Sequence, residues 1–329
     1  MRLAPSPPRH WGRRLRRTVL VVLLAALGAT SWLAIDAHRD RTGDVLRRVG
    51  RVVRVEREPV AAPDGVVGEA ITLESSSGLV VNLRLLRRAT TQSDRLHPAA
   101  VILGGHNTGR NAVELVGDPG NVVVVALDYP IDGDEHIKGL VKVLEAVPRI
   151  RRALLDTPAA AALALAWLAE EPGVDPNRIE LLGVSLGAVF APIAAGIEPL
   201  ASRLWLVHGG ADPDRWLEHA LTDKVAQPQA RHAVATLAYY LARGPFFELD
   251  PWLARLAPRE LVVIAAREDS KLPHQLVEDL LSRTPGIVRF GWTEGGHVDP
   301  DEPEIVRALI STVLGGIEGN PPPLWQRER

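Results

Sequence analysis

The chain has 329 residues, 46% hydrophobic and 24% charged, a length sufficient for one large α/β domain or two smaller ones. It contains no cysteine, which excludes disulfides, thiolate nucleophiles and cysteine-ligated zinc sites. The net charge of −2 is unevenly distributed: residues 1–57 carry 13 arginines and 4 acidic residues, and the remainder carries 25 basic and 36 acidic residues. Because binding to phosphates requires a basic face, the acidic remainder argues against a nucleic-acid partner.

The N-terminal segment is predicted to bind a membrane. Residues 1–17 are basic, and an uncharged stretch of 18 residues follows at 18–35, which is at the short end for a transmembrane anchor. The positive-inside rule keeps residues 1–17 in the cytoplasm and places the rest of the chain on the periplasmic or extracellular face. The alternative is a signal peptide, with Ala26-Leu27-Gly28 as its cleavage site and a secreted product.

The chain from 36 onward divides into three parts. Residues 36–65 are rich in arginine and end in a proline-containing stretch, and we interpret them as a linker, either a stalk or a short surface helix, between the membrane and the domain. Residues 66–316 form the predicted globular domain. Residues 317–329, with three consecutive prolines, are expected to be a disordered tail.

The globular part begins with a hairpin and then alternates strands with helices, which predicts a mostly parallel, doubly wound α/β sheet with flanking helices. A helical period that ends at Pro148 predicts one helix, and Thr157 with Pro158 after it predicts the start of the next. The expected strands lie at 69–74, 79–85, 99–103, 121–128, 178–182, 204–207, 261–265 and 287–292. The expected helices lie at 137–147, 159–170, 188–195, 213–243, 273–283 and 303–314.

The segment Gly183-Val184-Ser185-Leu186-Gly187 joins a predicted strand to a predicted small-residue helix. A Gly-x-Ser-x-Gly at such a junction is typical of a nucleophile elbow, in which a strained turn projects the serine hydroxyl above the sheet. Glycine at the two flanking positions lets the strand and the helix approach closely.

With this elbow, with Ala265–Pro273 and with Glu294-Gly-Gly-His297, the chain from Val66 to Gly315 resembles the α/β-hydrolase superfamily, and within it the dienelactone-hydrolase and prolyl-oligopeptidase-like serine hydrolases. The superfamily orders its triad as nucleophile, acid and histidine. The resemblance implies that Ser185 is the nucleophile, that His297 is the base, and that Asp269 orients the imidazole.

Other polar residues also follow the ends of predicted strands and offer alternatives to these assignments. Glu268 and Asp212 are the competing acids. His106 and His208 either line the pocket or are structural histidines, and Asp128 is interpreted as a residue that fixes a loop.

The oxyanion hole needs two backbone N–H groups, and each is expected from a segment that follows a strand. The first is that of Leu186, directly after the nucleophile. The second is that of His106 or of Gly105, in the loop after the strand at 99–103. The apolar-rich segment 212–257 either packs against the sheet or forms a small helical cap that selects an apolar group of the substrate.

The predicted function is that of a serine hydrolase of esters, thioesters or amides, foremost a membrane-anchored carboxylesterase with a small-molecule acyl substrate. The sequence has no Gly-x-Gly-x-x-Gly, phosphate-binding loop or paired-histidine motif, so no cofactor or metal is expected. A short-peptide peptidase or an acyltransferase would use the same acyl-enzyme. The alternative outside the enzymes is a catalytically silent, membrane-tethered binding protein. The oligomeric state is not predicted.

Overall fold

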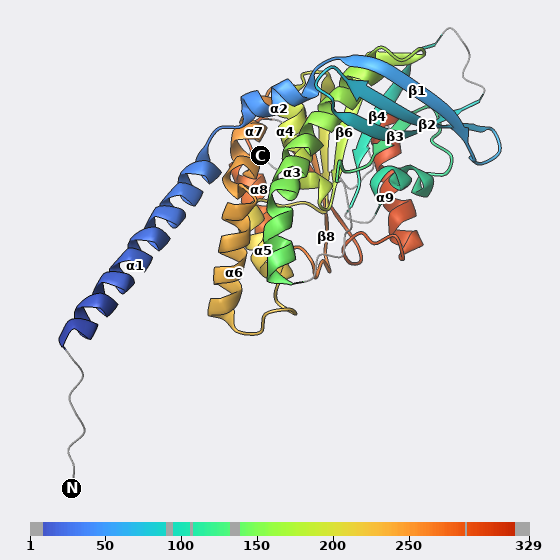
Figure 1. Ribbon diagram of the computed structural model, residues 1–329. Coiled ribbons are helices and arrows are strands. Elements are labelled where there is room, and N and C mark those ends of the chain that lie inside the picture. Colours follow the sequence, from blue (N-terminus) through green and yellow to red (C-terminus); the bar gives the residue numbers. More distant parts are fainter. Residues whose placement is uncertain (1–8, 90–94, 106–107, 132–138, 287, 320–329) are drawn as a thin grey trace.

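In the computed structural model, the described residues are 9–89, 95–105, 108–131, 139–286 and 288–319, and they contain a nine-stranded sheet flanked by helices (Figure 1). The strand order is β1-β2-β3-β5-β4-β6-β7-β8-β9. Pairs from β1 to β3 and the β3–β5 pair are antiparallel, and all pairs from β5 to β9 are parallel. The strands are β1 Val52–Val60, β2 Val66–Ser75, β3 Val80–Arg88, β4 His97–Leu103, β5 Val123–Leu127, β6 Val174–Val184, β7 Ala201–Val207, β8 Glu260–Ala266 and β9 Val288–Thr293.

The helices are divided between the two faces of this sheet. Helices α2, α3, α4, α7 and α8 contribute to the hydrophobic core on one face, and the short η1 and α9 pack on the other (Figure 1). The predicted doubly wound arrangement is therefore present. The bounds are α1 Arg9–His38, α2 Thr42–Val49, η1 Gly109–Leu115, α3 Leu140–Ala169, α4 Gly187–Ile197, α5 Pro213–Ala220, α6 Pro228–Leu241, η2 Gly244–Phe247, α7 Asp250–Leu256, α8 His274–Arg283 and α9 Pro303–Glu318.

The central strands are buried from both sides. Every residue of β4 and of β5 is buried, as expected for apolar strands that helices cover on both faces. Within β4, Val101 and Leu103 belong to the core beneath α3 and α4, whereas Ala100 and Ile102 belong to the core beneath α9. Alternate residues of one strand thus supply two separate cores.

The interpretation of 36–65 as a linker is wrong. The segment does contain a short helix, α2, but it also contains β1, which pairs antiparallel with β2 and extends the sheet. β1 is nearly all exposed and mostly charged after Val55, so its hydrophobic alternation is too short to reveal a strand. Arg57 forms an ion pair with Glu171, which fixes this edge strand to the end of α3.

The predicted helix boundary around Pro148 to Pro158 is also wrong, because α3 runs through both prolines. Thr157 is not a helix cap: its Oγ1 donates a hydrogen bond to the carbonyl of Ala153 at 2.8 Å inside the helix. A proline removes one helical hydrogen bond at a cost of about 3 kcal/mol. The second half of α3, from Ala159 onward, is almost entirely buried, and this burial offsets that cost.

The single helical stretch expected at 213–243 is two helices, α5 and α6, because residues 221–227 do not continue the helix and Pro228 starts a new one. The segment 212–257 also has two parts with different surroundings. Its last part, η2 and α7, is buried beside α4 and belongs to the core. Its first part lies against the loop after β8, since Trp216 Nε1 donates to the carbonyl of Lys271 at 3.0 Å.

Two ends of predicted elements differ from the structure. α9 continues to Glu318, so residues 317 and 318 are helical and not part of a tail. Residues 320–329 and 132–138 lie outside the described residues, and the latter include the start of the helix predicted at 137–147.

The N-terminal helix α1 is long and apolar and meets the domain at its C-terminal end. Residues 16–38 have a mean hydropathy of 2.2 over their most apolar window, none of which is buried against the protein. Asp36 forms ion pairs with three arginines that lie outside α1, namely Arg41, Arg151 of α3 and Arg243. Among the described residues, one further helix is long and apolar enough to span a membrane, at 145–169, and it is mostly buried in the domain.

Candidate active site

Ser185 occupies a strained turn between β6 and α4. Its φ of 52° lies in the left-handed region, which residues with a side chain seldom adopt. A Cβ on Gly187 would lie 2.1 Å from the carbonyl oxygen of Leu103, and one on Gly183 would lie 2.7 Å from the carbonyl oxygen of Gly187. The two glycines are therefore required by the close approach of β6, α4 and β4, and this approach holds the serine at the carboxyl end of the sheet.

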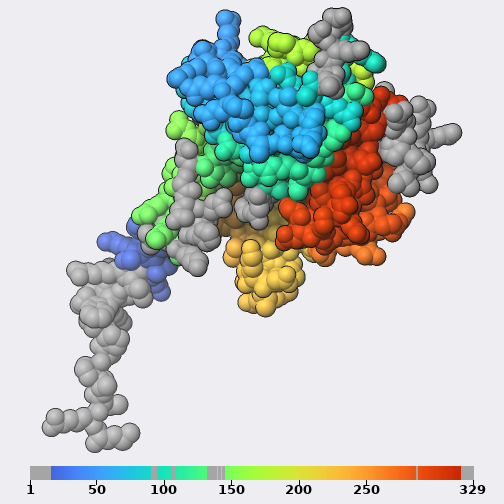
Figure 2. Space-filling model, turned by 90° about the vertical axis from the view of Figure 1, so that its right-hand side faces the viewer, coloured from blue at the N-terminus to red at the C-terminus, as the bar shows by residue number. Residues whose placement is uncertain are grey.

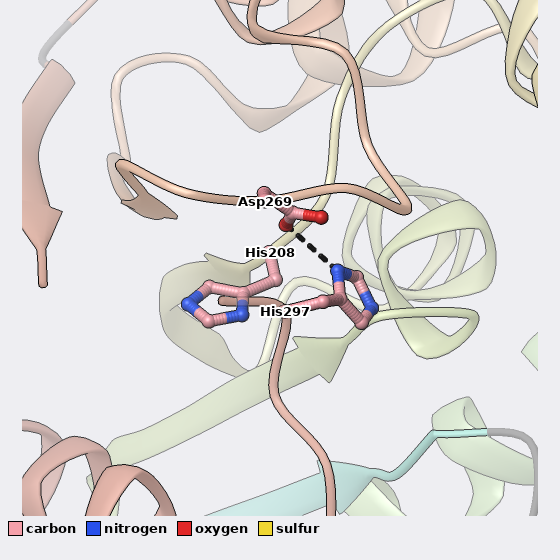
Figure 3. A group of neighbouring side chains, drawn as sticks. All are labelled: His208, Asp269 and His297. Carbon is pink, nitrogen blue, oxygen red and sulfur yellow. Dashed lines mark hydrogen bonds and ion pairs between the residues drawn. The ribbon is translucent and has the colours of Figure 1, made fainter. Parts of the chain in front are cut away.

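The structure brings Ser185, His297 and Asp269 together in one chain of hydrogen bonds. Ser185 Oγ lies 2.7 Å from His297 Nε2, and His297 Nδ1 lies 2.7 Å from Asp269 Oδ2. Each residue follows the carboxyl end of a parallel strand: β6, β8 or β9. Figure 3 shows the carboxylate of Asp269 directed at the His297 ring. This is the geometry needed for a base that takes a proton from a serine hydroxyl.

The environment of Asp269 keeps it ionised. Burial alone would raise the pKa of this carboxyl, but its hydrogen bond with His297, the charge of that ring and two backbone N–H groups hold the pKa below its usual range. These N–H groups, of Lys271 and Leu272, donate to Oδ1 at 2.9 and 2.8 Å. Oδ2 remains for His297, so the carboxylate fixes the tautomer in which Nδ1 carries the proton and Nε2 faces the serine.

Two of the three residues predicted to form the oxyanion hole, Leu186 and Gly105, lie among the described residues. Leu186 is the residue that precedes the first turn of α4, where backbone N–H groups have no partner within the helix. Gly105 lies next to Ser185, because a Cβ built on it would be 3.8 Å from Ser185 Cβ. The hydroxyl of Tyr129 donates to the carbonyl of Gly104 and anchors this loop. His106, the other predicted donor, lies outside the described residues.

The competing acids have other partners. Asp212 forms ion pairs with Arg215 and Arg283, and the side chain of Glu268 is exposed. Asp128 accepts a hydrogen bond from the backbone N–H of Arg110 at 2.8 Å and forms an ion pair with the same residue. Its contacts are those of a residue that fixes the start of η1.

His208 has a structural contact, which the sequence did not specify, to the loop that carries His297. It follows β7, is fully buried, and accepts at Nδ1 a hydrogen bond of 2.7 Å from the backbone N–H of Val298, next to His297. Its ring lies 5.4 Å from that of His297, centre to centre (Figure 3). The signal in the sequence was only a histidine at a strand end, which gave no indication of this partner.

We expect His208 to act as a positioning residue. Substitution His208→Phe removes the acceptor for the Val298 N–H and should lower kcat for an ester by about 10²-fold with little change in KM, because a small displacement of the His297 loop misaligns the base. His208→Asn keeps an acceptor at nearly the same place and should retain most of the activity. Equal kcat values for the two variants would contradict this role.

The same histidine should make stability depend on pH. Burial, and then the neighbouring His297, lower the pKa of His208 from 6.5 to about 4, with Asp269 opposing them. Between pH 6.5 and 4 the unfolded chain therefore binds a proton that the folded protein does not, so the free energy of unfolding falls as the pH falls through this range. Urea titrations at pH 7, 6, 5 and 4.5 should show a smaller fall for His208→Asn than for the parent. A constant difference between the two proteins would refute the assignment.

His208, Asp269 and His297 also offer ligand atoms within 4.8 Å of one another, a spacing that a metal ion could use. However, both nitrogens of His297 already have partners, in Ser185 and Asp269, and Nδ1 of His208 accepts from Val298. A metal would have to replace the His297–Asp269 hydrogen bond. The arrangement therefore fits proton transfer better than metal binding.

Comparison with known proteins supports the fold. No protein-family model and no curated protein matches the chain. Acetyl xylan esterase 1 from Thermoanaerobacterium sp. JW/SL YS485 is similar over 84% of this chain and 94% of that chain, with 14% identity and a TM-score of 0.60. An acetyl xylan esterase from Paenibacillus sp. R4 is similar over 82% and 92%, with 14% identity and a TM-score of 0.59. A puromycin hydrolase is similar over 83% of this chain but 42% of that chain, with 15% identity and a TM-score of 0.56. At these identities the likeness establishes a shared fold.

Proposed function

We propose that this chain, which has the α/β-hydrolase fold, is a serine hydrolase that cleaves carboxylic esters through an acyl-enzyme. The observation that carries the proposal is the chain of two 2.7 Å hydrogen bonds that joins Asp269, His297 and Ser185. These hydrogen bonds align a base with a hydroxyl, which a purely structural contact would not require. The strained serine also lies at the carboxyl edge of the sheet, where ligands bind in folds of this type.

In the proposed reaction Ser185 Oγ attacks the ester carbonyl while His297 Nε2 takes its proton. The oxyanion that forms is stabilised by the N–H groups of Leu186 and of the Gly105–His106 loop. His297 then donates the proton to the departing alcohol, and the acyl group remains on the serine. A water molecule, deprotonated by His297, attacks the acyl-enzyme, and the acid is released with Ser185 restored.

An ester is preferred over an amide as the substrate because two of the structures most similar in fold are named as esterases. Thioesters and amides remain outcomes of the test, as does transfer of the acyl group to another acceptor. The silent binding protein, the alternative outside the enzymes, would have no need of an aligned base.

The proposal is tested with a fluorophosphonate probe, which reacts with activated serines, followed by mass spectrometry of the labelled peptide. We expect one label per chain, on Ser185, and turnover of p-nitrophenyl esters by the same preparation. A folded protein that takes no label and hydrolyses no ester would favour the silent binding protein. Labelling of a different serine would show that the nucleophile is misassigned.

We also propose that α1 anchors the protein in a membrane, with the catalytic domain on the periplasmic or extracellular face. The support is its length, its apolar exposed surface at 18–35 and the attachment of its end to the domain through Asp36. In membranes washed with alkaline carbonate, the full chain should stay in the pellet and keep its original N-terminus. A soluble form that begins after the Ala26–Gly28 site would instead establish a cleaved signal peptide.

A further inference from the structure

An apolar cavity of about 110 Å³ lies on the α9 side of the sheet. Its floor is formed by alternate residues of the central strands, among them Ala100 and Ile102. Leu309 and Val313 of α9 form one wall and Ala112 of η1 forms another. In Figure 2, α9, in red, adjoins the teal-green segment that contains η1 on the face turned toward the viewer.

The cavity exists because this face of the sheet is thinly covered. The connection from β4 to β5 contains η1, which has only seven residues, whereas the opposite face carries the 30-residue α3. Small residues, Ala100 and Ala112 on the two sides and Gly105 at one end, leave space that larger side chains would fill.

This cavity borders the active site, although Ser185 and His297 themselves do not line it. Gly105, the predicted oxyanion residue, is part of its wall, and so are Val184 and Val298, the residues next to Ser185 and His297 in the chain. Gly105 on the cavity wall is close to Ser185, because a Cβ built on it would lie 3.8 Å from Ser185 Cβ.

The apolar lining of the cavity favours an apolar ligand. The described lining residues are apolar except Thr108, whose hydroxyl already donates to the carbonyl of Gly105 at 3.1 Å. A sugar or a peptide would lose hydrogen bonds to water there without replacement, whereas a hydrocarbon chain would gain from burial. An apolar cavity of about 150 Å³ is known to accommodate benzene, so 110 Å³ has room for about four carbon atoms.

We propose that this cavity binds the acyl chain of the substrate, and that the enzyme prefers esters of medium-chain acids of about six carbons. Two carbons, the carbonyl and its neighbour, remain at Ser185 and about four enter the cavity. This inference rests on the proposed function and specifies its substrate class. Val313 and Leu309 on α9 determine the length of the chain that fits.

The test measures kcat/KM for p-nitrophenyl acetate, butanoate, hexanoate, octanoate and decanoate. Burial of one methylene is worth about fourfold, so kcat/KM should rise about 250-fold from acetate to hexanoate and should level or fall with longer chains. An activity that is highest with acetate and falls steadily with length would overturn the proposal while leaving the serine hydrolase intact.

Substitutions in α9 distinguish the cavity from other apolar surfaces. Val313→Phe, which fills the cavity, should lower the ratio of hexanoate to acetate kcat/KM at least tenfold. Val313→Ala, which lengthens the cavity, should raise the ratio of octanoate to hexanoate several-fold. Ala308→Phe adds the same ring to the exposed side of α9 and should leave both ratios unchanged.

The two opposite shifts separate a specific effect from loss of folding, because a destabilised protein would lower all rates together. If all three variants keep the parental chain-length profile, the acyl chain does not bind in this cavity. If the folded parent hydrolyses no ester of any length, the proposed function fails, and the assignment of the acyl chain fails with it.

Discussion

Substitution Ser185→Ala should lower kcat for p-nitrophenyl butanoate by about 10⁴- to 10⁶-fold and should leave the thermal unfolding temperature almost unchanged. Removal of the nucleophile eliminates the acyl-enzyme, and only the background from substrate binding and the oxyanion hole remains. Ser185 Oγ is hydrogen-bonded to His297 and contributes little to the core, so its loss should cost little stability. Steady-state kinetics and a thermal melt measure the two effects.

The matched control is Ser202→Ala, whose hydroxyl donates to the carbonyl of Ile179 at 2.9 Å, far along the sheet from the active site. It should retain parental activity. If Ser185→Ala keeps more than about a tenth of the parental kcat, a different group attacks the carbonyl, and the mechanism must be reassigned.

Substitution Asp269→Asn should lower kcat by about 10⁴-fold, a loss that depends on the two backbone donors at this site. The N–H groups of Lys271 and Leu272 require an oxygen at the position of Oδ1, so the amide nitrogen of the new side chain must face His297 Nδ1. Nδ1 must then act as the acceptor and the proton moves to Nε2. His297 would present a donor to Ser185 in place of a lone pair and could not act as base.

The competing acids provide the controls for this prediction. Glu268→Gln and Asp212→Asn should each stay within about threefold of the parental kcat, and Asp212→Asn should cost at most about 1 kcal/mol because its arginine partners are partly exposed. An active Asp269→Asn, or an inactive Asp212→Asn of unchanged stability, would transfer the orienting role to another carboxylate.

The parts of this molecule that the sequence predicted have strong local signals. The elbow at Ser185 depends on a turn whose glycines lie within two residues of the serine, and the central strands carry uninterrupted apolar runs. Asp269 and His297 could be proposed because each follows a strand in the order of a known superfamily. The structure places both beside Ser185, although they are distant in sequence.

The parts that the sequence did not predict depend on contacts between distant segments. β1 is a strand because β2 offers it an unpaired edge, and its own residues show only a short alternation of apolar and charged side chains. α3 passes through two prolines because tertiary burial outweighs local propensity. The contact of His208 with the Val298 N–H joins residues 90 positions apart, so no spacing in the chain could reveal it.

The cluster around Asp36 has a consequence for the reach of the enzyme. α1 continues without interruption to His38, and its end is attached to α3 and to the residues after α6 by Arg151 and Arg243. With α1 in a bilayer, as proposed, the catalytic domain would be attached rigidly to the membrane helix and would not reorient freely about a flexible linker. The tilt of α1 would then determine the distance of Ser185 from the membrane surface and the direction in which the active site faces. It would therefore also determine which part of the membrane surface an ester must occupy to reach Ser185.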